Sequence, residues 1–307
     1  LFRSLDKKGQ KDGVKKTLYA NSFCLMAFGK LGGSELNYSS DIDLVALYDD
    51  GALKAAGETE VAATSFFQEA LTDFHHIMTC YTEEGHVYRV DFNLRPYGRS
   101  GEFVQSLSQL KTYYQEHAAQ WEVQALLKAT PLVGNWWIGF EWMQFFRQKL
   151  LGRFDYDTHR KAILTLREHA IKKYTQKYGD RVEIKNGEGG IRDIEFLVQA
   201  LQLRWGAVHP AILQGNTWEA LAQMGRVGLL SQRVIEQLRT GYVLLRHMEH
   251  FLQIYEDQQV HHLPQDVAEQ TVLAKQVFGQ KATADQLLKE VTRIMKRNRK
   301  LYLENMG

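Results

Sequence analysis

The stretch GKLGGSELNYSSDIDL, residues Gly29–Leu44, is the most informative part of this sequence. It follows the apolar run SFCLMAF at 22–28 and leads into the apolar run DIDLVALY at 41–48. Short apolar runs bounded by glycines and turn residues are typical of buried strands. The sequence therefore predicts two strands joined by a glycine-rich turn.

Two aspartates of the second run are expected on one face of its strand. Side chains alternate across a sheet, so Asp41 and Asp43 point to one face and the apolar residues point to the other. The alternating stretch HVYRVDFNLRP at 86–96 predicts a third strand, on which Asp91 is a candidate third acid. Three neighbouring carboxylates repel unless a cation neutralises them, and their hard oxygens suit Mg²⁺ or Mn²⁺. The pattern favours a metal site for phosphoryl or nucleotidyl transfer over a solvated strand edge.

The glycine-rich turn is suited to phosphate. Its backbone N–H groups can approach a phosphate closely, and Lys30 adds a positive charge. The spacing fits neither the P-loop nor the dinucleotide fingerprint. Arg95 is a candidate for a bidentate phosphate contact, with a salt bridge to a site carboxylate as the alternative.

These motifs resemble a known superfamily. An apolar strand, a glycine-containing turn and then S-D-x-D on the next strand resemble the DNA polymerase β type nucleotidyltransferases, although the usual Gly-Ser or Gly-Gly pair is here Gly29-Lys30. Three longer strings resemble one branch, the bifunctional glutamine synthetase adenylyltransferase and adenylyl-removing enzyme. They are the stretch at 29–44, YRVDFNLRPYGRSG at 88–101 and IKNGEGGIRDIEFLVQ at 184–199. The resemblance extends from about Phe23 to about Pro264.

The resemblance implies a set of site residues and a reaction. The implied metal ligands and catalytic residues are Asp41, Asp43 and Asp91, and the implied phosphate neighbours are Gly29, Lys30 and Ser40. ELNYSSDIDL and GEGGIRDIEF are closest to the N-terminal unit of that family. This unit removes AMP from a tyrosine of glutamine synthetase by attack of phosphate, which releases ADP.

The same resemblance implies partners and leaves alternatives. Glutamine synthetase is the expected protein substrate, a PII-type nitrogen-signalling protein is an expected partner, and ATP or ADP and phosphate are expected ligands. One alternative is the forward reaction, in which AMP from ATP is added to the tyrosine. Another is a catalytically silent module that binds nucleotide or a signalling protein.

The pattern of the chain predicts an α+β fold with two domains. Strand and helix signals alternate up to Pro131, and helical periodicity dominates afterwards. Together with the resemblance, which implies a polymerase β type nucleotidyltransferase domain, this pattern leads us to expect that domain with the metal site at 1–133 and an all-α helical bundle at 134–307. The expected helices cover about 59–80, 106–128, 155–178, 191–204, 216–228, 231–257 and 283–305.

A second glycine-rich segment, NGEGG at 186–190, has two interpretations. It resembles a phosphate cradle, but a tight turn that leads into a helix explains its glycines equally well and is favoured. On the following helix, Arg192, Asp193 and Glu195 are expected to face outward, towards either a cleft or one another. The basic run at 293–300 is more typical of a solvated helix face than of a partner contact.

Composition narrows the class of protein. Of 307 residues, 44% are hydrophobic and 24% are charged, and no run has the length of a membrane span. A net charge of +2 does not favour nucleic-acid binding. Two cysteines, Cys24 and Cys80, give neither a disulfide framework nor metal-ligand spacing, so a cytoplasmic location is expected. Because the sequence begins at Leu1, we expect a fragment of a longer protein.

Overall fold

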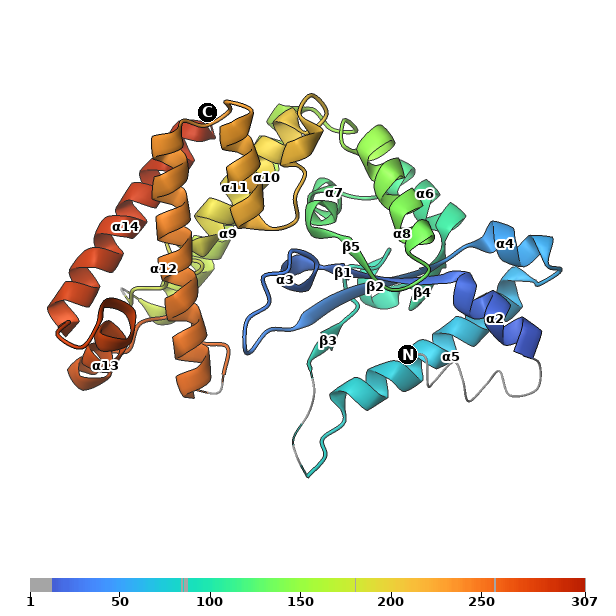
Figure 1. Ribbon diagram of the computed structural model, residues 1–307, viewed down its shortest axis with the longest axis horizontal. Helices are drawn as coiled ribbons and strands as arrows, with labels where there is room; N and C mark the ends of the chain where they lie inside the picture. Colours follow the sequence, from blue (N-terminus) through green and yellow to red (C-terminus); the bar gives the residue numbers. More distant parts are fainter. Residues whose placement is uncertain (1–12, 84, 86–87, 180, 257, 307) are drawn as a thin grey trace. The chain divides into compact units, whose positions relative to one another are not determined.

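The structure is a computed structural model that describes residues 13–83, 85, 88–179, 181–256 and 258–306 (Figure 1). Contacts divide it into two compact units. The sheet unit comprises the residues up to Leu36 together with Ser40–Phe154, and the helical unit comprises Asn37–Ser39 and the chain from Asp155 onward. The predicted α+β class, a small mixed sheet followed by a helical region, is confirmed.

The sheet unit contains one mixed sheet. Its strands are β1 (Phe23–Phe28), β2 (Ile42–Tyr48), β3 (Val90–Asp91), β4 (Val104–Ser106) and β5 (Thr130–Gly134). β1 lies antiparallel between β2 and β5, and β2 is parallel to both β3 and β4. β3 pairs with the beginning of β2 and β4 with its end.

The helices of the sheet unit cover both faces of this sheet. They are α2 (Gly13–Asn21), α3 (Gly29–Gly32), α4 (Asp50–Ala55), α5 (Glu60–Thr79), α6 (Leu107–Glu116), α7 (Gln120–Ala125) and α8 (Trp136–Phe145). α2 and α5 lie on one side of the sheet and α8 on the other (Figure 1). The division at Phe154 differs from the predicted boundary after residue 133, because β5 pairs with β1 and α8 packs on both strands.

The core fixes which face of β2 carries the aspartate. Ile42 and Leu44 belong to a buried cluster that includes Phe67 of α5. Because side chains alternate along a strand, Asp43 lies on the opposite face of β2. The expected alternation of this strand is therefore confirmed.

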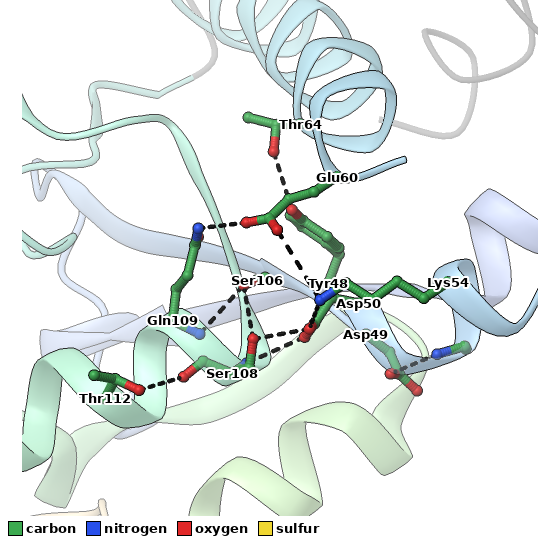
Figure 2. A network of polar contacts seen from close by, with 11 residues as sticks. Tyr48, Asp49, Asp50, Lys54, Glu60, Thr64, Ser106, Ser108, Gln109 and Thr112 are labelled. Carbon is green, nitrogen blue, oxygen red and sulfur yellow. Dashed lines mark hydrogen bonds and ion pairs between the residues drawn. The ribbon is translucent and has the colours of Figure 1, made fainter. Parts of the chain in front are cut away.

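A polar network anchors the other end of β2 (Figure 2). Asp50 accepts hydrogen bonds from Lys54 Nζ at 2.9 Å and Ser108 Oγ at 2.8 Å. Gln109 Nε2 donates to Glu60 Oε1 at 2.5 Å. Burial by itself would raise the pKa of Asp50, but the hydrogen bonds from Lys54 and Ser108 outweigh it and lower the pKa. The network links α4, α5 and α6 at the strand end remote from Asp43.

The third strand is shorter than predicted. β3 contains only Val90–Asp91, and residues 86 and 87 of the expected strand lie outside the described residues. After Asp91 the chain turns, because Arg95 Nη1 donates to the Phe92 carbonyl at 2.8 Å and Arg95 Nε donates to the Gly101 carbonyl at 2.9 Å. These side-chain contacts override the period-two pattern of the sequence.

The single helix expected at 106–128 is interrupted. α6 ends at Glu116, and α7 begins at Gln120. Arg153 Nη1 donates to the carbonyls of Tyr114 and Ala118, the latter at 2.7 Å. These bonds satisfy carbonyls that the end of α6 leaves without helical partners. Arg153 is remote in sequence, so local periodicity could not reveal the break.

The helical unit matches the expected helices closely. It contains α9 (Tyr156–Tyr178), α10 (Ile191–Trp205), α11 (Thr217–Arg226), α12 (Gln232–Glu256), α13 (Val267–Phe278) and α14 (Ala284–Asn305). Only α13 was not expected among them, although Asp266 caps it by accepting from the N–H groups of Ala268 and Glu269.

A buried ion pair organises the start of α10. Asp193 is fully buried, so the prediction that it faces outward was wrong. Arg167 Nε donates to Asp193 Oδ1, and Arg299 Nη1 approaches Asp193 Oδ2 at 3.4 Å. These three charged residues join α9, α10 and α14, because each helix contributes one of them.

The glycine segment 186–190 is a tight turn, as favoured. The Gly189 N–H donates to Asp193 Oδ2 at 2.6 Å, and the Gly187 N–H donates to Glu183 Oε2 at 2.7 Å. A Cβ atom at Gly189 would lie 1.7 Å from the Met295 carbonyl oxygen. The turn thus fits between α10 and α14 only without a side chain at this position.

Asp193→Asn should destabilise the helical unit strongly. The substitution leaves the Arg167 charge buried without its counter-charge, which typically costs about 3–5 kcal/mol. The measurement is the free energy of unfolding in urea. Glu290→Gln, which breaks the more exposed pair with Arg293 at 2.7 Å, is the matched control and should cost less than about 1 kcal/mol. Equal effects of the two substitutions would contradict this role of Asp193.

Candidate functional site

The turn after β1 brings the main chain against β2. Gly29 has φ +56°, and a Cβ atom there would lie 2.4 Å from Asp43 Oδ2. A Cβ atom at Gly32 would lie 1.8 Å from the Lys128 carbonyl oxygen. Gly32 is therefore required by the close approach of neighbouring main chain, whereas Gly29 is favoured by its positive φ and by the adjacent Asp43 carboxylate. Lys30 lies between them in α3 and is half-buried.

Asp43 and Asp91 are direct neighbours across two parallel strands. Their Cα atoms pair in the register of β2 and β3, which places both side chains on the same face. Burial raises the pKa of Asp43 to about 6, and the charges of Asp91 and Asp41 add to the effect. The three carboxylates predicted from the sequence are therefore close enough to influence one another.

Asp41 and Asp91 have polar partners of their own. Arg89 Nε donates to Asp41 Oδ1 at 2.6 Å, and both side chains of this pair are 45% exposed. Asn93 donates to Asp91 through its main-chain N–H at 2.5 Å and its side-chain amide at 2.9 Å. Within the described part of the chain, no group of three or more histidine, cysteine, aspartate or glutamate side chains is already arranged to hold a metal ion. A cation shared by the three aspartates would compete with the Arg89 guanidinium for Asp41.

Arg89 and Asn93 were not among the predicted site residues. The predicted strand placed both on the face of Asp91, but periodicity does not specify which carboxylate each would contact. The turn after Asp91 brings the main-chain N–H and the side-chain amide of Asn93 back to the Asp91 carboxylate. Pairing between β2 and β3 brings Arg89 beside Asp41, and the Ile42 N–H donates to the Arg89 carbonyl at 2.9 Å.

The other two predicted residues occupy different surroundings. Ser40 is half-buried and directly precedes Asp41 in the sheet unit. Arg95 is 8% exposed, and its three guanidinium nitrogens donate to the carbonyls of Phe92, Arg99 and Gly101. Among the described residues it forms no ion pair with a carboxylate. Arg95 shapes the turn that follows Asp91.

Comparison with known proteins identifies the relatives of both units. Residues 3–141 match the family glutamate-ammonia ligase adenylyltransferase, and residues 157–304 match the family GlnD PII-uridylyltransferase. The first match contains the glycine turn and the three aspartates. The second contains most of the helical unit.

Two full-length relatives carry the same name, bifunctional glutamine synthetase adenylyltransferase/adenylyl-removing enzyme. The protein from Pseudomonas aeruginosa is 37% identical over 247 residues, which cover 79% of this chain and 24% of that protein. The protein from Methylococcus capsulatus is 36% identical over 258 residues, which cover 83% of this chain and 26% of that protein. The chain is a homologue of these bifunctional enzymes. The predicted resemblance is confirmed, and the chain spans about a quarter of the length of the curated relatives it matches.

None of the helices in the described ranges combines the length and the apolar character needed to cross a bilayer.

The Asp43 carboxyl should titrate with a midpoint of about 6 in the metal-free chain. Because this pKa lies above the ordinary 3.8, the folded state holds more protons between these values. The contribution of Asp43 to the free energy of unfolding therefore falls as pH rises through about 4 to 6 and is constant above that window. Carboxyl ¹³C NMR measures the midpoint.

Asp91→Asn tests the cause of this shift. Removal of the neighbouring charge should lower the pKa of Asp43, which should nevertheless stay above 3.8 because burial is the larger cause. A midpoint near 4 in the unsubstituted chain, or no change in Asp91→Asn, would show that the two carboxylates do not interact.

Proposed function

We propose that this chain is a metal-dependent nucleotidyltransferase unit that removes AMP from an adenylylated tyrosine of glutamine synthetase. Inorganic phosphate is the acceptor and ADP is the product. The observation that carries the proposal is the pairing of Asp43 with Asp91 beside the Gly29 turn. The names of the two relatives include both addition and removal of the adenylyl group, so the direction rests on motif resemblance.

Asp41, Asp43 and Asp91 fit a site for Mg²⁺ or Mn²⁺. Their donors are hard carboxylate oxygens, and the raised pKa of Asp43 reports repulsion that a cation would relieve. A bound divalent ion would supply positive charge to the phosphoryl oxygens. Gly29 keeps the space beside Asp43 clear, because any side chain at this position would meet the carboxylate.

The phosphate neighbours are assigned to the turn. Inorganic phosphate and the phosphodiester both carry negative charge, so their approach requires nearby cations. We assign Lys30 to this task and Ser40 to a hydrogen bond with a phosphate oxygen, with Gly29 allowing the main chain to approach. One oxygen of inorganic phosphate bonds to the AMP phosphorus, the bond from phosphorus to the tyrosine oxygen breaks, and that oxygen takes a proton.

The motifs favour removal over addition. ELNYSSDIDL at 35–44 and GEGGIRDIEF at 187–196 resemble the adenylyl-removing unit of the family. Addition of AMP from ATP to the tyrosine is the second candidate, since both relatives carry both activities in their names. The same carboxylates would serve either direction.

Partners and location complete the proposal. Glutamine synthetase is the protein substrate, and a PII-type signalling protein is a regulatory partner. The match of residues 157–304 to the GlnD PII-uridylyltransferase family supports a PII contact on the helical unit. A cytoplasmic location is supported by two free cysteines, Cys24 and Cys80, as is usual in a reducing compartment.

The direct test uses adenylylated glutamine synthetase, Mg²⁺ and phosphate. The chain should release ADP, and Asp43→Asn should lower the rate by about 10²-fold or more, since it removes charge at the reacting phosphorus. Asp73→Asn on the exposed face of α5 makes the same chemical change away from the site and should retain activity. Incorporation of AMP from ATP into unmodified glutamine synthetase, without release of ADP from the modified form, would establish the second candidate instead.

Arg89→Gln should increase the affinity of the chain for Mn²⁺ by about two- to tenfold. The Arg89 guanidinium contacts Asp41 Oδ1 at 2.6 Å, and its positive charge would repel a metal ion bound there. Its removal therefore favours metal binding. Electron paramagnetic resonance of free Mn²⁺ gives the affinity. Arg99→Gln removes the same charge from an exposed position and should change the affinity much less. Weaker binding in Arg89→Gln would contradict competition for Asp41, whereas no Mn²⁺ binding by the unsubstituted chain would contradict the metal site itself.

A further inference from the structure

A pocket of about 490 Å³ lies within the helical unit. Its walls are α9, the segment after α9, the glycine turn and α14. The volume falls within the roughly 300–1,000 Å³ usual for small-molecule sites. The residues assigned above to nucleotidyl transfer do not line it.

Tyr174 lies on one wall of the pocket. Its hydroxyl oxygen is buried behind the wall surface and forms no hydrogen bond among the described residues. Glu183 lies nearby, because its charge contributes, after burial, to the raised pKa of Tyr174. Because the oxygen is not accessible, Tyr174 contributes lining surface and no hydrogen bond to a ligand.

Among the described lining residues, three are basic and two are acidic. Arg181, Lys296 and Arg299 line it, against Glu183 and Glu188. Burial raises the pKa of Glu183 to about 7, although three main-chain N–H groups donate to its carboxylate. Arg299 pairs with Glu188 at 3.4 Å.

Lys296 is the basic residue best placed for a ligand. It is exposed on α14 and forms no ion pair with the residues that the structure describes. The adjacent wall is apolar and consists of Ile171, Val182 and Met295. A ligand that combines an acidic group with a short apolar body would therefore complement both Lys296 and the apolar wall.

We propose that this pocket binds a small organic anion, with its acidic group beside Lys296 and its apolar body against Ile171, Val182 and Met295. An inorganic oxyanion shares the acidic chemistry but would leave the apolar wall without contacts. The site is independent of the proposed adenylyl removal, because every lining residue belongs to the helical unit. It lies in the segment that matches the GlnD PII-uridylyltransferase family.

Methyl NMR of the full chain, labelled with ¹³C at the methionine methyl groups, tests the proposal. The chain has seven methionines, of which Met295 lines the pocket and Met26 lies in β1 as an internal reference. Met295→Leu assigns the reporting signal. Succinate, at up to about 10 mM to cover a weak site, should shift the Met295 signal and leave that of Met26 in place. Sulfate serves as the inorganic oxyanion for comparison and should bind more weakly than succinate.

Two substitutions examine the contact assigned to Lys296. Lys296→Gln should weaken succinate binding by about three- to tenfold, whereas Lys300→Gln, one turn further along α14, removes the same charge and should have little effect.

Several outcomes would overturn the proposal. They are the absence of any Met295 shift with succinate, equal or tighter binding of sulfate, and equal effects of Lys296→Gln and Lys300→Gln.

Discussion

The close approach of Gly29 to Asp43 is the constraint on which the candidate site depends. Gly29 has φ +56°, and a Cβ atom there would lie 2.4 Å from Asp43 Oδ2, so a side chain at this position would strain the main chain and displace the Asp43 carboxylate. All six residues of β1 pair with residues 43–48 of β2, and β3 places Asp91 beside Asp43. The result is a half-buried carboxylate with a pKa of about 6, beside the glycine turn that carries Lys30. The proposed binding of a phosphate and a divalent cation rests on this arrangement.

Much of the site could be predicted because its signals are local. The alternation of Ile42, Asp43 and Leu44 gives the correct face, since the core against α5 buries one side of β2. The neighbourhood of Asp91 was also correct, but the length of its strand was not. Arg95 bends the chain through hydrogen bonds to main-chain carbonyls, and such contacts leave no periodic trace in the sequence. The pairing of β5 with β1 is equally non-local, which is why the boundary after residue 133 differs from the division at Phe154.

The helical unit shows the same distinction between local and tertiary information. Helix positions were predictable, because apolar periodicity and caps are properties of neighbouring residues. The burial of Asp193 was not predictable, because the apolar periodicity of α10 places this residue on the polar face of the helix. Its charge is accommodated only because Arg167 from α9 and Arg299 from α14 meet it. A charged residue on the face that is expected to be exposed can thus be buried in a structural ion pair. Asp193 also accepts a hydrogen bond from the Gly189 N–H and so holds the glycine turn at 186–190.

The metal site at the three aspartates is the central claim of this account. A crystal structure of the chain with Mn²⁺ and a nucleotide, with anomalous scattering recorded at the manganese edge, tests it most directly. The account predicts anomalous peaks within bonding distance, about 2.0–2.6 Å, of carboxylate oxygens of Asp43 and Asp91, with Asp41 turned from Arg89 towards the ion. A nucleotide-bound structure without manganese at these carboxylates, or with Asp41 still paired to Arg89 and the ion bound elsewhere, would contradict it.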